Sequence, residues 1–434
     1  MLRSRFLSRC LSVALSLCPA GMVAAQTTIQ TTIQTTLSVP ARTFVESLGV
    51  NTHLEYTDGR YADAQRVLKD LQFLGVSYVR NGIPQSIEHQ GLGLGLESWD
   101  TLAKAGVRFN VPIPGDADLP LQMEQIRIEL KRHPGMVASV EGPNEINNAP
   151  VHYAGLTGDE AARALQRAIY TAVHSEPMLR GVPVYYFTGG SPVDLAQSPG
   201  LADFANAHPY PHFGEQPSTW LAKEFRDYFE ASETTPKVIT ETGYYTDPTS
   251  RDWGGVDAPT QAKLLVNTWF DAVQQGISRT FLYQLLDPYA PTQPQGVGAD
   301  AKLGLFYLDD TPKPAALAIA RLTKLLADRP SRPQAIPMML EGMPETGHSL
   351  VLTRADGSIL VALWNEVSIW DTKSMKSLAT QPVKVRLLVR GREALQLFDP
   401  VNDTRESFTK ASGGEVSVEV PDHVVLIVFA PQHS

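Results

Sequence analysis

The apolar positions between residues 47 and 326 form short runs that alternate with longer segments of helical period. Short apolar runs bounded by turn residues are typical of buried parallel strands, whereas apolar residues spaced three and four apart are typical of amphipathic helices. The runs predict strands at residues 47–55, 76–83, 107–113, 137–145, 182–188, 204–210, 237–245 and 280–287. The helical patterns lie between and after them, at residues 60–74, 96–105, 119–132, 159–179, 218–230, 261–275 and 314–326.

The order of these elements predicts an α/β fold, a (β/α)8 TIM barrel over residues 43–328. Eight strands, each followed by a helix or by a connection of helical length, is the number that closes such a barrel. Gly75, Gly106 and Gly276 each stand between a helical segment and a strand, where a left-handed glycine commonly ends a helix. A doubly wound open sheet is the alternative fold with the same alternation.

A different pattern begins after the Pro- and Arg-rich run at residues 329–333, which marks a domain boundary. Strand-like segments follow at residues 349–354, 359–364, 383–389, 415–420 and 424–429, and a hairpin turn is predicted at Asp356 and Gly357. Short alternating strands joined by tight turns predict a C-terminal antiparallel β-sandwich domain over residues 335–431. We expect one apolar face of this domain to cover a flank of the barrel.

Residues 1–25 have the pattern of a signal peptide, with three arginines, a short apolar stretch and a small-residue cleavage site that ends at Ala25. Both cysteines, Cys10 and Cys18, lie in this leader. A mature chain without cysteine suits an exported protein, periplasmic or secreted, that is held together by its core. Residues 26–42 are rich in Thr and Gln without helical period and predict a linker, with one edge strand as the alternative.

Charge and composition exclude several classes of partner. The 434 residues carry 37 Lys+Arg against 46 Asp+Glu, which gives a formal net charge of −9, and they contain no basic block. A nucleic-acid binder needs a cationic surface to displace counterions, so no nucleic-acid partner is expected. No run of about 18 apolar residues follows the leader, so no membrane span is expected either. No cofactor is expected, since phosphate-loop and calcium-loop spacings are missing. We also expect a monomer.

A metal site is not expected. His208 and His212 have the spacing of two metal ligands, but no carboxylate or cysteine cluster accompanies them in the sequence.

The candidate chemistry lies at the carboxyl ends of the predicted strands, where the loops of a (β/α)8 barrel form the active site. The polar residues at these ends are Asn51, His53, Arg80, Asn144, Glu145, His208, Tyr210, Glu241, Tyr244, Tyr283, Gln284 and Asp287. Glu145 and Glu241 end the fourth and seventh strands and are expected to face each other. Cleavage of a glycosidic bond requires such a pair: one carboxyl protonates the leaving oxygen, while the other attacks the anomeric carbon or activates water. We expect different pKa values, raised for the acid and low for the ionised partner.

The motifs around these glutamates resemble clan A of the retaining glycoside hydrolases, the (β/α)8 barrels that include the cellulase-type and the xylosidase/iduronidase-type families. The motifs are Glu-Gly-Pro-Asn-Glu at residues 141–145 and Ile-Thr-Glu-Thr-Gly at residues 239–243. Val-Arg at residues 79–80 and His-Pro-Tyr at residues 208–210 are similar to positions that those families use around the sugar in the −1 subsite. The resemblance covers residues 47–326.

The resemblance implies a role for several residues. Glu145 would be the acid/base and Glu241 the nucleophile. Asn144 would hold the sugar 2-hydroxyl, and Arg80 and Tyr210 would hydrogen-bond to the nucleophile carboxylate.

The chain departs from the family pattern at the eighth strand. Many relatives place a tryptophan there as the floor of the −1 subsite, and Gln284 stands at the matching place in this chain. Trp253 lies in a Gly-rich loop after the seventh strand, where an indole either stacks on a sugar face or packs in the core. His208, His53 and Tyr244 complete the predicted substrate-binding residues.

Together these features predict an exported glycosidase that hydrolyses O-glycosidic bonds of an oligo- or polysaccharide with retention, by double displacement. A transglycosylase is an alternative with the same carboxylate pair, in which a sugar hydroxyl replaces water. A non-catalytic saccharide-binding barrel is the alternative from another class, and loss of one glutamate would indicate it.

Overall fold

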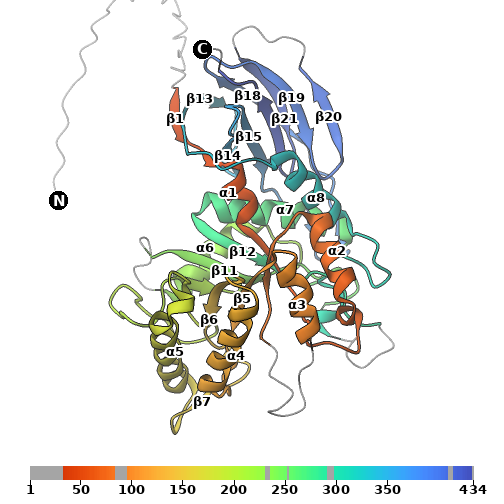
Figure 1. Ribbon diagram of the computed structural model, residues 1–434. Coiled ribbons are helices and arrows are strands. Elements are labelled where there is room, and N and C mark those ends of the chain that lie inside the picture. The colour runs from red at the N-terminus through yellow and green to blue at the C-terminus, as the bar shows by residue number, and fades with distance from the viewer. Residues whose placement is uncertain are drawn as a thin grey trace, which may run out of the picture. The chain divides into compact units, whose positions relative to one another are not determined.

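Eight parallel strands form the barrel of the protein in a computed structural model that describes residues 33–83, 95–229, 235–251, 254–290, 298–408 and 414–432. In chain order the strands are β3 (Leu48–Asn51), β4 (Tyr78–Arg80), β5 (Arg108–Pro112), β6 (Val137–Glu141), β9 (Val184–Tyr185), β10 (Ala205–Ala207), β11 (Lys237–Thr242) and β12 (Ile277–Leu282) (Figure 1). The predicted signal peptide and Trp253 lie outside the described residues.

The pairing of these strands confirms the predicted barrel. Strands that are neighbours in the chain are neighbours in the sheet, in the order β10-β11-β12-β3-β4-β5-β6-β9. One bridge between Tyr185 and Phe204 joins β9 to the residue before β10 and nearly closes the circle. A doubly wound sheet would reverse its strand order at one point, and this sheet does not.

Seven of the helices in the barrel region agree with the predicted helical patterns, and an eighth, α1, was not predicted. These helices are α1 (Ala41–Glu46), α2 (Ala64–Leu74), α3 (Leu96–Lys104), α4 (Leu119–Arg132), α5 (Gly158–Ser175), α6 (Pro217–Tyr228), α7 (Ala258–Gln274) and α8 (Pro314–Leu326). Asp63, Asp118 and Asp257 cap α2, α4 and α7 by accepting hydrogen bonds from the first turn. Gly75 ends α2 with a φ of 67°, in the left-handed region that was predicted for it. Of the helices described, none has the length and apolar character needed to cross a bilayer.

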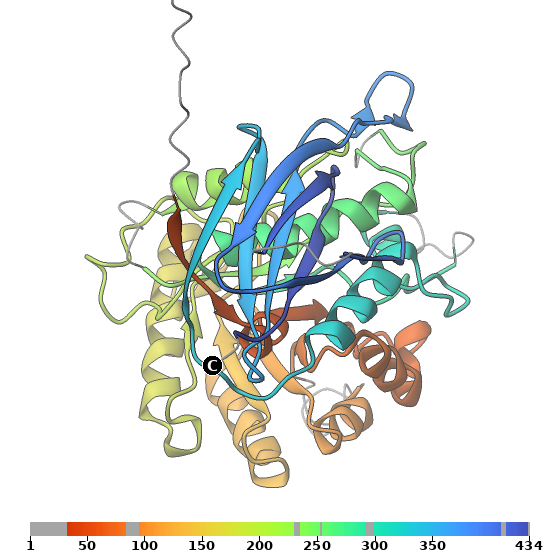
Figure 2. The same cartoon turned by 90° about the horizontal axis from the view of Figure 1, so that it is seen from above.

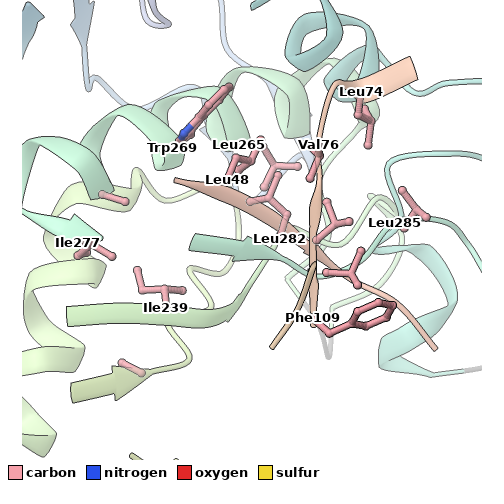
Figure 3. Close-up of a cluster of buried hydrophobic side chains, with 14 of the residues drawn as sticks. Leu48, Leu74, Val76, Phe109, Ile239, Leu265, Trp269, Ile277, Leu282 and Leu285 are labelled. Carbon is pink, nitrogen blue, oxygen red and sulfur yellow. The ribbon is translucent and has the colours of Figure 1, made fainter. Parts of the chain in front are cut away.

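The core of the barrel forms where apolar faces of the helices meet the strands. Figure 3 shows Leu48 of β3 and Leu282 of β12 close to Leu265 and Trp269 of α7. Trp269 is fully buried, stacks on Phe44 of α1 at 4.4 Å between ring centroids, and donates its indole N–H to the hydroxyl of Ser47. Burial of each large apolar side chain contributes about 1.5–3 kcal/mol, so this layer stabilises the closed barrel.

Two further sheets are built mainly from the C-terminal residues. The four-stranded sheet has the order β1-β13-β18-β21 and the six-stranded sheet the order β2-β14-β15-β22-β19-β20. Their strands are β1 (Gln34–Leu37), β2 (Val39–Pro40), β13 (Ala335–Glu341), β14 (Gly347–Thr353), β15 (Ile359–Asn365), β18 (Val383–Val389), β19 (Ala394–Asp399), β20 (Thr404–Ser407), β21 (Glu415–Val420) and β22 (Val425–Phe429). Strands β1 and β2 lie in the segment predicted as a linker, where an edge strand was the alternative, and they pair with β13 and β14.

The six-stranded sheet is apolar on both faces. Leu360, Ala362 and Trp364 of β15 belong to the hydrophobic cluster of the barrel, together with Leu350 and Leu352 of β14. The intervening residues of β15, Ile359, Val361 and Leu363, belong to a second cluster that includes residues of the four-stranded sheet. Because successive side chains of a strand point to opposite faces, β15 buries one face toward the barrel and the other toward the second sheet. Figure 2 shows these C-terminal strands, in blue, from above.

A buried histidine lies where the C-terminal sheets meet the barrel. His423 contacts Asp399 through Nε2 at 3.0 Å and Asp422 through Nδ1 at 2.7 Å. Asp422 also accepts a hydrogen bond from Lys263 of α7 at 2.9 Å. Burial lowers the pKa of His423, but the two aspartates outweigh burial, and the pKa lies above its ordinary value. The imidazolium therefore stabilises this junction.

We expect His423→Gln to lower the free energy of unfolding by about 1–3 kcal/mol at pH 6 and by clearly less at pH 9. The folded-state pKa of His423 is raised, so its stabilisation is complete below the ordinary pKa of 6.5 and is lost as the pH rises through the folded-state value. Urea unfolding of both proteins at the two pH values measures the difference. An equal loss at both pH values would contradict the role of the charge.

Candidate active site

The carboxyl ends of the barrel strands bring together most of the predicted site residues. Asn51 ends β3, Arg80 ends β4, and Glu241 lies near the end of β11. Asn144 and Glu145 follow β6, and His208 and Tyr210 follow β10. In a barrel these ends lie on one face, so residues far apart in the chain meet there.

Arg80 organises these residues. The residue is 7% exposed, and its guanidinium donates to both oxygens of Glu141, at 3.0 Å from Nε and 2.9 Å from Nη2. Nη1 donates to Glu241 at 2.6 Å and to Asn51 at 3.1 Å, and Nη2 also donates to Asn144 at 2.6 Å. A guanidinium has five N–H donors, so each of them is engaged.

The charges of Arg80 and Glu141 depend on each other. Burial raises the pKa of Glu141, but the positive charge and hydrogen bonds of Arg80 outweigh burial, and the pKa lies below its ordinary value. Burial lowers the pKa of Arg80, while Glu141 and Glu241 raise it further than burial lowers it. Removal of either partner would leave a buried, uncompensated charge, which costs about 3–5 kcal/mol.

Glu241 is held by two donors. Its Oε1 accepts the hydrogen bond from Arg80, and its Oε2 accepts one from the hydroxyl of Tyr210 at 2.8 Å. Burial raises the pKa of Tyr210 well above 10, so this phenol keeps its proton and donates it. The two contacts hold both carboxylate oxygens of Glu241 in place.

Glu145 has an unusual backbone and a paired side chain. Its φ is 41°, in the left-handed region that few non-glycine residues adopt, and its N–H donates to the hydroxyl of Thr188 at 2.9 Å. Its carboxylate contacts His208 Nδ1 at 2.9 Å and accepts a hydrogen bond from Asn148 at 2.9 Å. The contact with His208 lowers the pKa of Glu145 more than burial raises it. The expectation of a raised pKa for this carboxyl is therefore wrong for the free protein, because of His208.

His208 joins Glu145 to the buried ion pair. Its Nε2 lies 2.8 Å from the hydroxyl of Thr240, and that hydroxyl lies 3.0 Å from Oε1 of Glu141. If Thr240 donates to the Glu141 carboxylate, the hydroxyl must accept from Nε2. In that arrangement Nδ1 of His208 and the carboxyl of Glu145 share one proton.

The two candidate catalytic carboxylates are close to each other and line one cavity. One carboxylate oxygen of Glu145 and one of Glu241 lie within 4.8 Å of each other, with a ring nitrogen of His208 within the same distance. The cavity has a volume of about 740 Å³ and is lined by residues of the predicted set, Arg80, Asn144, Tyr210 and His53 among them. A cavity of this size at the mouth of a barrel accommodates a small organic molecule such as a sugar.

Two of the predicted substrate-binding residues that the structure describes stand apart from this group. Tyr244 is 2% exposed, and its hydroxyl donates to the carbonyl of Glu215 instead of facing the cavity. Gln284 is fully buried and accepts a hydrogen bond from Tyr61 at 2.8 Å, so it does not line the cavity, and its neighbour Tyr283 does. Trp253 lies outside the described residues.

From the sequence, Glu141 received no role, and at the eighth strand end the binding role went to Gln284 and not to its neighbour Tyr283. Glu141 ends a strand whose other residues are buried, and a charged residue at the end of a buried strand signals a buried partner of opposite charge. That signal was available, because the second strand ends in Arg80. Tyr283 was named among the polar residues at the strand ends, but no pattern in the sequence favoured it over Gln284 for the cavity wall.

Carboxylates surround His208, contrary to the expectation from sequence spacing. Within the described residues, Glu145, His208 and Glu241 form one of three groups whose ligand atoms are close enough to share a metal ion. Arg80 already places a positive charge 2.6 Å from Glu241, which disfavours a second cation at this carboxylate. The other groups are Asp100 with Glu129 and His133, and Asp271 with His348 and Glu366.

Solved structures of similar fold include glycoside hydrolases. A family 39 glycoside hydrolase from the gut symbiont Bacteroides cellulosilyticus WH2 has a TM-score of 0.57 at 13% identity, over 91% of this chain and 82% of that chain. A monomeric β-xylosidase from Caulobacter crescentus CB15 has a TM-score of 0.55 at 13% identity, over 92% and 98% of the two chains. A GH39 enzyme from Xanthomonas axonopodis pv. citri has a TM-score of 0.53 at 15% identity, over 92% and 97%.

These similarities establish the fold, and they agree with the resemblance to clan A that the strand-end motifs suggested. No protein-family model and no curated protein matches the sequence.

We expect Arg80→Lys to lower the free energy of unfolding by about 3 kcal/mol, although it keeps the positive charge. Lysine cannot donate to both oxygens of Glu141 and also reach Glu241. Urea unfolding measures the loss, and Arg127→Lys is the matched control. Arg127 also bridges two glutamates, Glu124 and Glu176, but at the surface, where the same change should cost less than about 1 kcal/mol. Equal losses would contradict the role of burial.

Proposed function

We propose that the protein is a retaining glycoside hydrolase in which Glu241 is the nucleophile and Glu145 the acid/base. The observation that carries the proposal is the carboxylate pair in one cavity, with oxygens within 4.8 Å of each other. Retaining glycosidases separate their two carboxyl groups by about 5–5.5 Å, whereas inverting enzymes leave about 6.5–9.5 Å for a water molecule. The close approach of the two glutamates supports retention.

The contacts of each glutamate support its role. Glu241 accepts hydrogen bonds from two donors, Arg80 and Tyr210, which orient the carboxylate for attack on the anomeric carbon. The attack forms a bond between Glu241 and the sugar, while the bond to the leaving oxygen breaks and Glu145 gives that oxygen a proton. In the second step Glu145 takes a proton from water, whose oxygen displaces Glu241 and restores the enzyme.

His208 adjusts the acid/base residue. Its Nδ1 lies 2.9 Å from the carboxylate of Glu145, and this contact lowers the pKa of Glu145 more than burial raises it. In the proposed cycle the Glu145 carboxyl protonates the leaving oxygen, so the contact with His208 sets how far the pH can rise before Glu145 loses the proton that it must give.

Two other functions use parts of the same geometry. A transglycosylase would need the same pair and a site for an acceptor sugar in place of water. A non-catalytic saccharide-binding barrel would not need two carboxyl groups with oxygens within 4.8 Å of each other in one cavity, so the pair favours an enzyme.

The proposal extends to the rest of the chain. The shared cluster of the C-terminal sheets supports a β-sandwich accessory domain over residues 335–431. The predicted leader supports export after cleavage near Ala25. A monomer is proposed as well, the state named for the Caulobacter crescentus β-xylosidase of similar fold.

We expect Glu241→Ala to abolish turnover of every glycoside, with slow rescue by azide and inversion of the product, because the small anion fills the place of the nucleophile. Glu145→Ala should lose about 10²–10⁴-fold on natural substrates but retain the first step on dinitrophenyl glycosides, which leave without a proton. Burst kinetics and product stereochemistry measure both effects. Glu124→Gln, a change to a surface carboxylate, is the control.

Two outcomes would contradict the assignment. The roles are reversed if azide rescues Glu145→Ala instead of Glu241→Ala. The function is not glycoside hydrolysis if the wild-type protein releases no aglycone from a panel of aryl glycosides and no reducing sugar from polysaccharides.

The pH dependence should change in a defined direction when His208 is replaced. In His208→Leu the largest cause that lowers the pKa of Glu145 is removed, while burial still raises that pKa. The carboxyl should then stay protonated to higher pH, and the alkaline limb of kcat/KM on an unactivated glycoside should move upward. A pH profile of both proteins measures the shift, and an alkaline limb that moves downward would contradict the role given to His208.

A further inference from the structure

We propose that Glu55, held by His53 and Asn81, binds the hydroxyls of the sugar and makes the cavity selective for neutral glycosides over uronides. The inference rests on the proposed function and names the substrate class of that same site.

Glu55 is a third carboxylate on the cavity wall, and it is fixed in place. Its Oε1 lies 3.1 Å from Nδ1 of His53, and its Oε2 accepts a hydrogen bond from Asn81 at 3.3 Å. Asn81 is positioned in turn, since its Oδ1 accepts from the hydroxyl of Thr52 and from the N–H of Leu54. The side chain of Glu55 is 48% exposed, so each oxygen has room for another hydrogen bond from the cavity side.

The ring of His53 is oriented by Tyr283. The hydroxyl of Tyr283 lies 2.9 Å from Nε2 of His53, and the ring of His53 stacks on Tyr56 at 4.5 Å between centroids. With the Tyr283 hydroxyl donating to Nε2, Nδ1 carries the proton and donates to Glu55. Burial raises the pKa of Glu55, but the hydrogen bond and charge of His53 outweigh burial and keep that pKa below its ordinary value. Glu55 is thus an acceptor at neutral pH.

A chain of contacts connects Glu55 to the proposed nucleophile. The rings of Tyr283 and Tyr210 meet edge to face at 6.4 Å between centroids, and the hydroxyl of Tyr210 donates to Glu241. All of these residues line the same cavity. A sugar whose anomeric carbon lies at Glu241 therefore has its other hydroxyls within the part of the cavity that Glu55 faces.

The described wall of the cavity offers no free lysine or arginine for a substrate carboxylate. Among the described residues that line it, Arg80 alone is a lysine or arginine, and its five N–H groups already bind Glu141, Glu241, Asn51 and Asn144. The chain segments 84–94, 252–253 and 291–297, which the structure does not describe, contain neither lysine nor arginine. Glu55, Glu145 and Glu241 face the cavity as carboxylates. A uronide would add a further negative charge and meet repulsion, whereas the hydroxyls of a neutral sugar donate to carboxylates.

The test compares kcat/KM for the aryl xyloside, glucoside, galactoside and glucuronide across wild type, Glu55→Gln, Glu55→Lys and the control Glu124→Gln. We expect wild type to favour the best neutral substrate by at least about 100-fold over the glucuronide. Glu55→Gln should lose about 10–100-fold on that neutral substrate, as expected when a hydrogen bond to a charged group is weakened. Glu55→Lys should raise activity on the glucuronide, and Glu124→Gln should change neither.

Deoxy substrates separate direct binding from a structural role. A deoxy substrate that lacks the sugar hydroxyl bound by Glu55 should have a much lower kcat/KM with wild type. With Glu55→Gln its kcat/KM should fall much less, since the hydrogen bond to that hydroxyl is already weakened. The proposal is overturned if Glu55→Gln keeps wild-type kcat/KM, if every deoxy substrate slows both proteins equally, or if wild type prefers the glucuronide. These results leave the proposed hydrolase intact, whereas a wild-type protein inactive on every glycoside overturns both.

Discussion

The site depends on one buried guanidinium. Asn51 and Asn110 are direct neighbours of Arg80 in the register of β3, β4 and β5, so the three side chains form a polar layer across adjacent strands. Asn110 donates to Glu141, which ends the next strand, and Arg80 completes the layer by binding Glu141 and Glu241. A one-residue slip of any of these strands would leave a charge buried without its partner, so the same contacts that orient the carboxylates also fix the strand register.

The sequence was sufficient to predict the barrel and the positions of Glu145 and Glu241, because these features depend on the local pattern of apolar and polar residues. Apolar runs and helical periods mark each element, and left-handed glycines such as Gly75 mark where helices end. A polar residue directly after a buried run must lie at a strand end, which located Arg80, Glu145 and Glu241. The prediction of the C-terminal strands was less complete, since β13, β19 and β20 were not predicted. Apolar and polar residues alternate too weakly along these partly exposed strands to indicate a strand.

Side-chain direction at the strand ends could not be predicted. Successive residues of a strand point to opposite sides, but β11 has register shifts between Lys237 and Thr242, so counting along the sequence does not give the direction. Tyr283 therefore took the cavity position that was expected for Gln284, which turns to Tyr61 instead. The prediction of a raised pKa for Glu145 was wrong for a related reason. His208, which contacts Glu145, lies at the end of another strand, and no spacing in the sequence indicates that contact.

The C-terminal sheets affect the site only through the barrel. Every described residue that lines the cavity lies between Asn51 and Leu303, whereas the six-stranded sheet packs with its Leu360, Ala362 and Trp364 face in the barrel cluster. Trp364 donates its indole N–H to Asp271 of α7, a helix that packs on β12, and β12 leads into Tyr283. A strand apolar on both faces cannot be exposed without loss of the free energy of burial on each side. The sheets thus hold α7 and β12 in place, and the cavity wall that Tyr283 shares with His53 depends on that support.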